Sequence, residues 1–216
     1  MHDTDRTANL LGATALAVTD LALATATKAA GVSASGAAAL VALSATPGLS
    51  VTELGRRVGL SQSAAARMVD SLEAGGLIER RQGVGRFVSV TTTAVGGRTA
   101  QAVLAARGTP LTEIVGGLDE DDQDALAGLL GKLLTRLYGE LGNAQLLCRL
   151  CDRGTCVRDG AVCPVGQAEC DRLRDDEHGE EHSSERNGER SDERGNKSSS
   201  GHSTKQRGGH GQARGS

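Results

Sequence analysis

Aromatic residues are almost missing from this chain of 216 residues, which contains one Phe, one Tyr and no Trp. Recognition of RNA by stacking bases on aromatic rings is therefore disfavoured. Without rings, the core has to be packed from Ala, Leu and Val. Such a composition favours closely approaching helices over a sandwich of sheets.

Histidine is scarce in the part of the chain that we expect to fold. The five histidines all lie outside that part: His2, His178, His182, His202 and His210. Catalysis by histidine and a histidine-built metal site in the core are therefore disfavoured. We predict that the protein is not an enzyme.

Long apolar runs are also lacking. Residues Met1 to Arg6 are mixed in charge, and the helix expected after them is a polar one of Ala and Thr. The longest leucine-rich segment, Leu126 to Leu141, is interrupted by Lys132, Arg136 and Glu140. We therefore expect no secretory signal and no membrane span, and a cytoplasmic protein.

The segment from Ser50 to Val90 has the pattern of a helix, a tight turn, a second helix and a two-stranded hairpin. Leu54 and Val58 lie four residues apart and share one face of the first helix. Gly59 then permits a sharp turn, and the hydroxyl of Ser61 can cap the second helix. This is the layout of a helix-turn-helix that reads DNA.

The second helix, expected from Ser61 to Ala74, divides into two faces at 100° per residue. The apolar face, which we expect to dock on the first helix, is formed by Ala65, Met68, Val69 and Leu72. The opposite face carries small or polar groups that can approach base edges. The residues predicted to bind DNA from this helix are Ser61, Gln62, Ser63, Ala66 and Arg67.

A hairpin rich in arginine follows the glycine pair Gly75-Gly76. Residues 77–81 and 86–90 are predicted to be its strands, with a turn over residues 82–85. The residues of the hairpin that we predict to contact DNA are Arg80, Arg81 and Arg86.

Positive charge is concentrated in this region. The whole chain has a net charge of -3, yet the segment from Ser50 to Arg107 contains eight basic and four acidic residues. Helix-turn-helix geometry also occurs in ordinary helical cores, and surface arginines often only contact solvent. A local basic surplus in an acidic protein is nevertheless what phosphate contacts require. We therefore predict that the segment binds double-stranded DNA.

The sequence from Leu49 to Leu54 (LSVTEL) and from Gly76 to Arg81 (GLIERR) resembles the winged helix of the MarR family of bacterial transcriptional regulators. The resemblance extends over residues 7–147. It implies a homodimer whose recognition helices enter successive major grooves of a palindromic operator, while the wings contact the minor groove or the backbone. Arg86 would be the arginine at the wing tip. The family's wing commonly carries Asp-x-Arg, and here the triplet is Val84-Gly85-Arg86.

The fold expected on these grounds is mainly α (α+β), a winged helix-turn-helix with N- and C-terminal dimerisation helices. Helices are predicted over residues 7–30 and 35–45, before the helix-turn-helix, and over residues 94–106, after the hairpin, with a break or kink near Gly108 and Pro110.

A last long helix is expected to begin at the four carboxylates of residues 119–122, which complement the positive end of a helix dipole. A metal site at these carboxylates is the minor alternative. The leucines that follow repeat along one face of the helix: Leu126, Leu130, Leu133, Leu137 and Leu141. The stripe requires a partner, and in the family that the chain resembles the terminal helices form the dimer interface.

All five cysteines fall within 23 residues, with the spacing Cys-x2-Cys-x4-Cys-x6-Cys-x6-Cys. Four thiolates so close together suit a site ligated by cysteine alone, and nearby arginines can offset their charge. The predicted ligands are Cys148, Cys151, Cys156 and Cys163, with Cys170 as the spare.

Three occupancies of this site compete. An iron-sulfur cluster is the first choice, because the spacing is irregular and a Cys-Pro pair, Cys163-Pro164, recurs at cluster ligands. Zinc, structural or sensed, is the second. Metal-free thiol chemistry at Cys148 and Cys151 is the third, and stable disulfides are disfavoured in a reducing cytosol.

The position of the cysteines suggests how they act. If the leucine-striped helix continues past Leu147, Cys148 and Cys151 lie on its last turn. Binding or oxidation of the thiols would then fix the end of the dimerisation helix and set the spacing between recognition helices. The alternatives are a MarR-type regulator with structural zinc and a small-molecule effector, and a thiol redox protein.

The remaining sequence is poor in apolar residues. Residues 171–216 contain ten acidic and nine basic residues, and we predict that they form a disordered charged tail. The predicted organisation is a winged-helix and dimerisation domain over residues 7–147, a cysteine segment over residues 148–170 and this tail.

Overall fold

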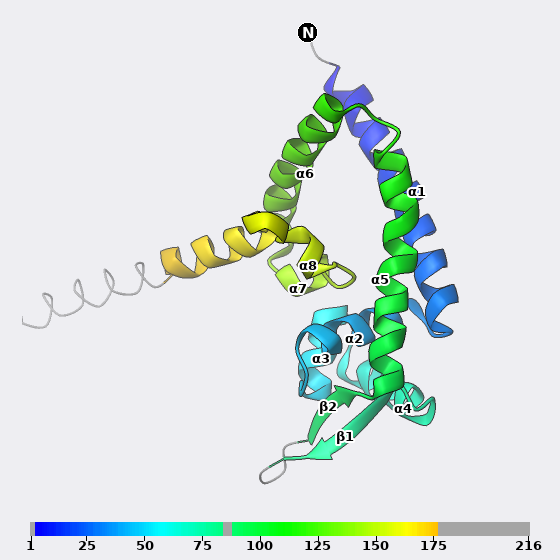
Figure 1. Ribbon diagram of the computed structural model, residues 1–216. Coiled ribbons are helices and arrows are strands. Elements are labelled where there is room, and N and C mark those ends of the chain that lie inside the picture. The colour runs from blue at the N-terminus through cyan, green and yellow to red at the C-terminus, as the bar shows by residue number, and fades with distance from the viewer. Residues whose placement is uncertain (1–2, 84–87, 177–216) are drawn as a thin grey trace, which may run out of the picture. The chain divides into compact units, whose positions relative to one another are not determined.

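The computed structural model describes residues 3–83 and 88–176, and this part of the chain is mainly helical with a two-stranded sheet (Figure 1). Residues up to Cys170 belong to one compact unit. Its elements are α1 (Thr4–Ala30), α2 (Ala34–Ala45), α3 (Val51–Val58), α4 (Gln62–Ala74), β1 (Ile78–Gln82), β2 (Val88–Thr92), α5 (Ala94–Val115), α6 (Glu120–Leu141), α7 (Ala144–Leu147), α8 (Arg153–Cys156) and a 3-10 turn (Arg158–Gly160). The predicted mainly α fold with a wing is confirmed.

Hydroxyl caps fix where the two helices of the helix-turn-helix, α3 and α4, begin. The Oγ of Ser50 accepts from the backbone N–H of Glu53 at 3.1 Å and starts α3. The Oγ of Ser61 accepts from the N–H of Ala64 at 3.4 Å and starts α4, as predicted. Each cap satisfies a helix N–H that has no partner within the helix.

The α3–α4 crossing is close because small residues meet there. A Cβ placed on Gly55 would lie 2.7 Å from the Cβ of Ala65, which is fully buried in the crossing. Gly59 takes the left-handed conformation at φ 74°, which suits glycine, and turns the chain toward α4. The close approach of Gly55 to Ala65 and the turn at Gly59 thus confirm the predicted helix-turn-helix.

The wing is an antiparallel pair in which Ile78 lies opposite Thr92 and Gln82 opposite Val88. Leu49 bridges to Val90 and ties the wing to the start of α3. The strands begin and end within two residues of the prediction. Residues 84–87, which include the predicted contact Arg86, lie outside the described part.

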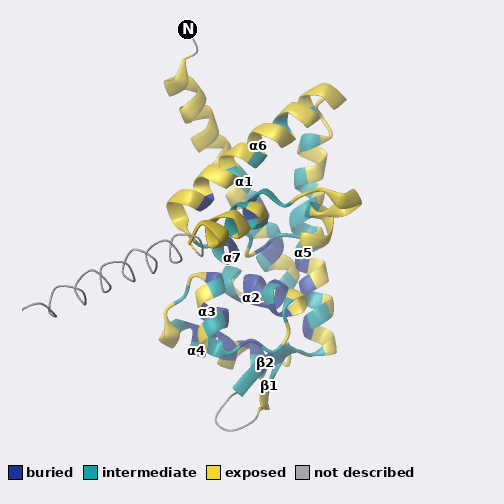
Figure 2. Cartoon of the chain, turned by 90° about the vertical axis from the view of Figure 1, so that its left-hand side faces the viewer, coloured by how far each residue is buried: buried dark blue, intermediate teal, exposed yellow. Residues whose placement is uncertain are grey.

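Buried residues concentrate in the part of the chain from α2 to the wing, which we call the reader (Figure 2). The main core joins α2, α3, α4, the wing and α5, and Leu40, Leu43, Leu54, Val69 and Val103 are fully buried in it. A second, smaller core is formed by Tyr138, Ala144 and Val165, and Leu134, Leu147 and Cys163 pack against it. The reader is therefore the better buried part of the molecule.

Helices α1 and α5 pack side by side along much of their length. α5 runs through Gly108 and Pro110 to Val115 as one helix, so of the predicted break or kink the break is excluded. Proline removes one helical hydrogen bond, but packing against a neighbouring helix stabilises a helix more than local propensity does.

α1 is more apolar than we expected. By length and composition it could cross a membrane, with a mean hydropathy of 1.5 over 18 residues, contrary to the expectation that no segment could. Alanine counts as apolar on that scale, which explains the value. In the structure, α1 instead lies along α5 and buries Ala22 and Ala26.

α6 starts as predicted, since the Asp119 carboxylate accepts from the N–H of Asp122 at 2.9 Å. It ends at Leu141, where Gly142 adopts the left-handed conformation at φ 62°. The leucine-striped helix therefore does not reach the cysteines, and the expectation that Cys148 and Cys151 lie on its last turn is wrong. Glycine, with no Cβ, ends the helix.

Between α6 and Asp176, where the described residues end, the chain forms the short elements α7, α8 and the 3-10 turn, followed by one longer helix. That helix begins at Pro164 and continues through Asp176. Residues 171–176, which we predicted as the start of a disordered tail, are therefore helical. The remainder of the predicted tail, residues 177–216, lies outside the described residues.

Candidate functional site

The outer face of α4 carries the side chains that the sequence analysis selected. Gln62, Ser63 and Arg67 are exposed, whereas Met68 and Val69, on the opposite face, are buried. Ala66 is half-buried, and Ser61 at the N-terminus is exposed while its hydroxyl caps the helix. The polar face of α4 is thus exposed to a partner, while its opposite face is packed in the core.

Arg80 holds the wing against α4. Its guanidinium pairs with the carboxylate of Asp70 at 2.6 Å and with that of Glu73, and its backbone N–H donates to Glu73 Oε1 at 3.1 Å. These carboxylates, Asp70 first, raise the pKa of Arg80 further above its usual value. The side chain is 28% exposed. Arg80 therefore orients the wing relative to the recognition helix.

Arg81 lies on the exposed side of the wing. Its guanidinium donates to Glu79 of the same strand, and its side chain remains 67% exposed. A pair of this exposure contributes little to stability, so the arginine can exchange its partner for a phosphate at small cost.

A charged network connects α3 to α2. Glu53 accepts from Arg56 at 2.8 Å and from Arg57 at 2.9 Å, and these hydrogen bonds lower the pKa of Glu53 from 4.5 to about 2. Arg57 also donates to the Thr46 hydroxyl at 3.1 Å. This network, which the sequence analysis did not identify, fixes the C-terminal end of α3.

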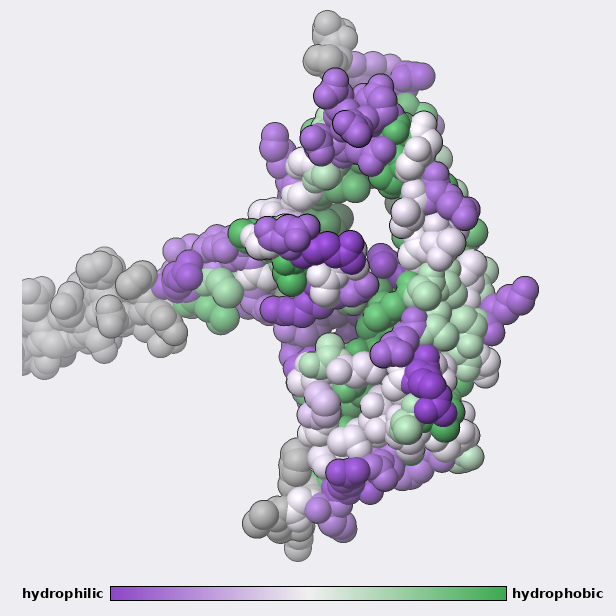
Figure 3. Space-filling model, viewed as in Figure 1, coloured by the Kyte–Doolittle hydropathy of each residue, from purple (hydrophilic) through white to green (hydrophobic). Residues whose placement is uncertain are grey.

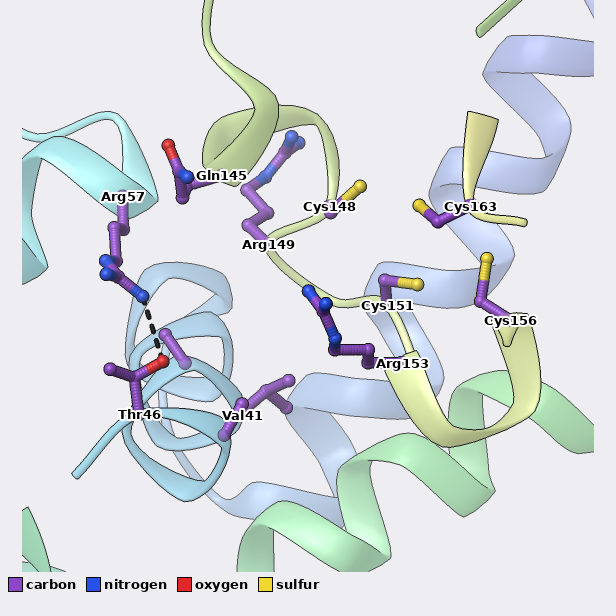
Figure 4. Close-up of a pocket in the computed structure, with 12 residues that line it drawn as sticks. Val41, Thr46, Arg57, Gln145, Cys148, Arg149, Cys151, Arg153, Cys156 and Cys163 are labelled. Atoms are coloured by element: carbon purple, nitrogen blue, oxygen red, sulfur yellow. Dashed lines mark hydrogen bonds between the residues drawn. The ribbon is translucent and has the colours of Figure 1, made fainter. Parts of the chain in front are cut away.

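Four cysteines converge on a cavity that residues of α2 also line. Cys148 follows α7, Cys151 lies in the next loop, Cys156 ends α8 and Cys163 precedes the helix that begins at Pro164. Their sulfur atoms point toward a shared space, and all four side chains line the same two cavities, of about 310 and 290 Å³ (Figure 4). We call these four residues the thiol cluster.

Neighbouring thiols and burial shift the acidities within the thiol cluster. Hydrogen bonding with the Cys151 thiol lowers the pKa of Cys148, and the same interaction together with burial raises that of Cys151. Burial, followed by the neighbouring Cys151 and Cys163, raises the pKa of Cys156 to about 11. The Sγ of Cys163 accepts from the backbone N–H of Gly166 at 3.4 Å and so lies at a helix N-terminus.

Arginines surround the thiol cluster. Arg57, Arg149 and Arg153 line the cavity on the α2 side, and Arg107 lines the cavity on the α1 and α5 side. In the view of Figure 4, the Arg153 side chain extends from the start of α8 to the side of Cys151 away from its sulfur, while Arg57 reaches toward Thr46. The positive charges can offset the negative charge that ionised sulfurs would bring into the cavity.

Two further observations bear on the predicted ligands. Cys170 is exposed and does not line either cavity, and its selection as the spare stays a prediction. Within residues 3–83 and 88–176, no three His, Cys, Asp or Glu side chains are arranged to hold a metal ion as they stand. Metal or cluster binding by the four thiols stays a prediction.

A third surface feature is an apolar face on the helices that flank the reader. The leucine stripe of α6 is exposed, and so are large apolar residues of α1 (Figure 3). They include Leu10, Leu11, Leu16, Leu130, Leu133, Leu137 and Leu141. Exposed apolar surface of this extent is typical of a protein-protein interface.

Comparison with known proteins agrees with the fold. Residues 30–86 match the model of the MarR family. The solved structure of a MarR family transcription regulator is 26% identical, with a TM-score of 0.56, over 65% of this chain and 95% of its own. A MarR family protein from Bacillus stearothermophilus is 20% identical, with a TM-score of 0.57, over 64% of this chain and 99% of its own.

MepR, a transcription regulator of the Staphylococcus aureus multidrug efflux pump MepA, is 17% identical, with a TM-score of 0.54, over 60% of this chain and 97% of its own. A search of curated proteins found no match to this sequence. The resemblance inferred from the residues around α3, α4 and the wing is thus confirmed for the fold.

Proposed function

We propose that the chain is a MarR-type, non-enzymatic DNA-binding transcriptional regulator that acts in the cytoplasm as a homodimer on a palindromic operator. The observation that carries this proposal is the exposed polar face of α4, held in place by the buried core on its other side. Such a helix fits the major groove, where each base pair presents a distinct pattern of donors and acceptors.

We assign direct base contacts to Gln62, Ser63 and Arg67, with Ala66 close enough for apolar contact with a thymine methyl group. Arg81 and the wing-tip Arg86 contact phosphate or the minor groove. Arg80, which we predicted as a DNA contact, serves in this proposal to hold the wing at the angle that the contact requires.

The exposed leucines support a homodimer. Four leucines of the α6 stripe, Leu130, Leu133, Leu137 and Leu141, are exposed within one chain, and so are Leu10, Leu11 and Leu16 of α1. A second copy would cover the same face of both chains, as two-fold symmetry requires. Two recognition helices related by that symmetry would read two half-sites about one helical turn apart.

We further propose that the thiol cluster binds an iron-sulfur cluster, with zinc as the second choice, and that its occupancy modulates operator binding. Residues 151–164, which contain Cys151, Cys156 and Cys163, bury no side chain fully. Apolar burial therefore contributes little to the position of this loop, and a bound ion or cluster can supply the missing stabilisation. The donor set is all sulfur, which soft metals and iron-sulfur clusters prefer.

The test of occupancy is chemical analysis of protein purified without air. We expect visible absorption bands with matching iron and sulfide, or zinc near one per chain. Cys156→Ser should lose the occupant, and Cys170→Ser should keep it, because Cys170 lies outside both cavities. Protein that contains no metal and no sulfide, and takes up neither on reconstitution, would refute the proposed cofactor.

One observation favours a second candidate, a metal-free thiol switch. Hydrogen bonding between Cys148 and Cys151 lowers the pKa of Cys148, which favours the thiolate that attacks an oxidant. A peroxide would take two electrons from the pair, giving a Cys148–Cys151 disulfide, an alcohol and water. Operator binding that responds to peroxide in metal-free protein, and no longer does so in Cys151→Ser, would support this candidate over the first.

A further inference from the structure

We propose that the thiol cluster acts on the recognition helix of its own chain through α7, with Leu146 as the positioning residue. The inference rests on the proposed regulation by the thiol cluster, and it specifies the contacts through which a change at the thiols reaches α4. It replaces the route through the end of the dimerisation helix, because α6 ends at Leu141, before the cysteines begin.

Leu146 lies against the turn of the helix-turn-helix. A Cβ built on Gly59 would lie 2.9 Å from Leu146 Cδ1, so this leucine touches the glycine between α3 and α4. α7 as a whole packs against α3. A shift of Leu146 is therefore transmitted to the point where the direction of α4 is set.

The thiol cluster begins two residues after Leu146. The backbone N–H of Cys148 donates to Ala144 at the start of α7, and that of Cys151 donates to Cys148 at 2.9 Å. The guanidinium of Arg149 donates to the carbonyl oxygen of Leu146 at 2.8 Å. With four residues, α7 has few internal hydrogen bonds, so its position depends on what holds its two ends.

The two leucines of α7 face different parts of the molecule. Leu146 contacts the turn of the helix-turn-helix at Gly59. Leu147 packs against the second core with Tyr138 and Val165 and lines the cavity of about 290 Å³ that the thiol cluster shares. Leu147→Ala therefore alters the thiol side of α7, and Leu146→Ala alters the side that meets the helix-turn-helix. The pair offers a matched comparison, because both are half-buried, have the same size and lie in the same turn of helix.

The reader also has a charged group in the same cavity. Arg57, at the C-terminal end of α3, lines the cavity of about 310 Å³ together with all four cysteines. A change of charge on the sulfurs alters the electrostatic potential in the cavity that this guanidinium also lines. Contact and charge therefore converge on the α3–α4 unit.

The test compares Leu146→Ala with Leu147→Ala. For each protein, operator affinity is measured by fluorescence anisotropy before and after a chelator strips the protein purified without air, and iron, sulfide and zinc are assayed on the same samples. We expect the wild type and Leu147→Ala to show a ratio of the two affinities of roughly 5 to 150. Leu146→Ala should keep the occupant and bind the operator with a ratio close to one.

An unchanged ratio in Leu146→Ala would overturn the inference and leave the proposed regulation intact. A ratio of one in the wild type would refute the regulation itself, and the inference with it.

A second measurement does not depend on a variant. Hydrogen exchange of the Leu60 amide, which donates to Gly55 at 2.9 Å across the turn, should become faster when wild-type protein is stripped. Unchanged exchange there would also count against the route.

Discussion

The reader and the thiol segment (residues 144–165) differ in what holds them in place. The reader, from α2 to the wing, is built around fully buried side chains such as Leu40, Leu54 and Val69. The thiol segment buries Ala144, Leu150 and Val165 near its ends and no side chain fully between residues 151 and 164. The reader is thus specified by its own apolar contacts, whereas few apolar contacts hold the thiol segment between residues 151 and 164.

The difference has a functional consequence. A reader with a complete core keeps its fold while a neighbouring segment changes state. A segment with little buried surface can change state at low energetic cost, because local stability follows local burial. Regulation by the thiol segment would therefore alter the pose of α4 without unfolding it.

The largest effect is expected for a substitution in the core of the reader. Leu54→Ala should lower the free energy of unfolding by about 2–5 kcal/mol, because the side chain is fully buried and its removal leaves a cavity. Urea denaturation followed by circular dichroism measures the change. The matched surface control is Val95→Ala, at a position that is 49% exposed, with an effect within about 0.5 kcal/mol. Equal effects at the two positions would contradict the contrast in burial.

The second prediction concerns the occupant of the thiol cluster. A ligand held only by the folded state, at 100 to 1,000 times its Kd, raises the free energy of unfolding by about 2.7 to 4.1 kcal/mol. Cys156→Ser should lose this increment and Cys170→Ser should retain it. Denaturation of metal-loaded and stripped samples measures it. If stripping leaves the stability of the wild type unchanged, nothing bound to the folded state at these sulfurs.

The third prediction separates base contacts from phosphate contacts. Arg67→Ala should cost about 1–3 kcal/mol of operator affinity and relax specificity at one base pair, because it removes a contact to a base edge. Arg81→Ala should weaken all sequences alike and reduce the slope of log K against log salt by about 1. Binding to a set of single-base variants at several salt concentrations distinguishes the two. Uniform loss in both variants would place the recognition face elsewhere.

The smallest effect is expected at Glu53. Its pKa is lowered from 4.5 to about 2 by hydrogen bonds from Arg56 and Arg57, so its contribution to stability is present above about pH 4.5 and is lost as the pH falls toward 2. Glu53→Gln should cost less than about 1 kcal/mol at neutral pH and flatten the loss of stability in this range. Unfolding measured between pH 2 and 7, with the exposed Glu113→Gln as control, tests this.

Sequence reasoning predicted the reader well because its rules are local. The cap at Ser61, the turn at Gly59 and the buried face with Met68 and Leu72 all follow from spacing of a few residues. The polar face of α4 was found by the same periodicity.

What could not be predicted depends on contacts between distant segments. α5 continues through Pro110 because α1 packs along it, and Arg80 pairs with Asp70 and Glu73 because the wing folds back on α4. The spacing of the cysteines indicated that they gather, but not that α7 places Leu146 at Gly59. Gly142, and Asn143 that caps α7 directly after it, are local signals that α6 ends before the cysteines.

The measurement that tests the account most directly is operator affinity of the same anaerobically purified protein before and after the thiol cluster is stripped. The account predicts a change of roughly 5- to 150-fold, with iron and sulfide, or zinc, lost in parallel. Cys170→Ser should behave like the wild type, and Cys156→Ser like the stripped protein. Equal affinity of the loaded and stripped wild type would contradict the claim that the thiol cluster controls the reader.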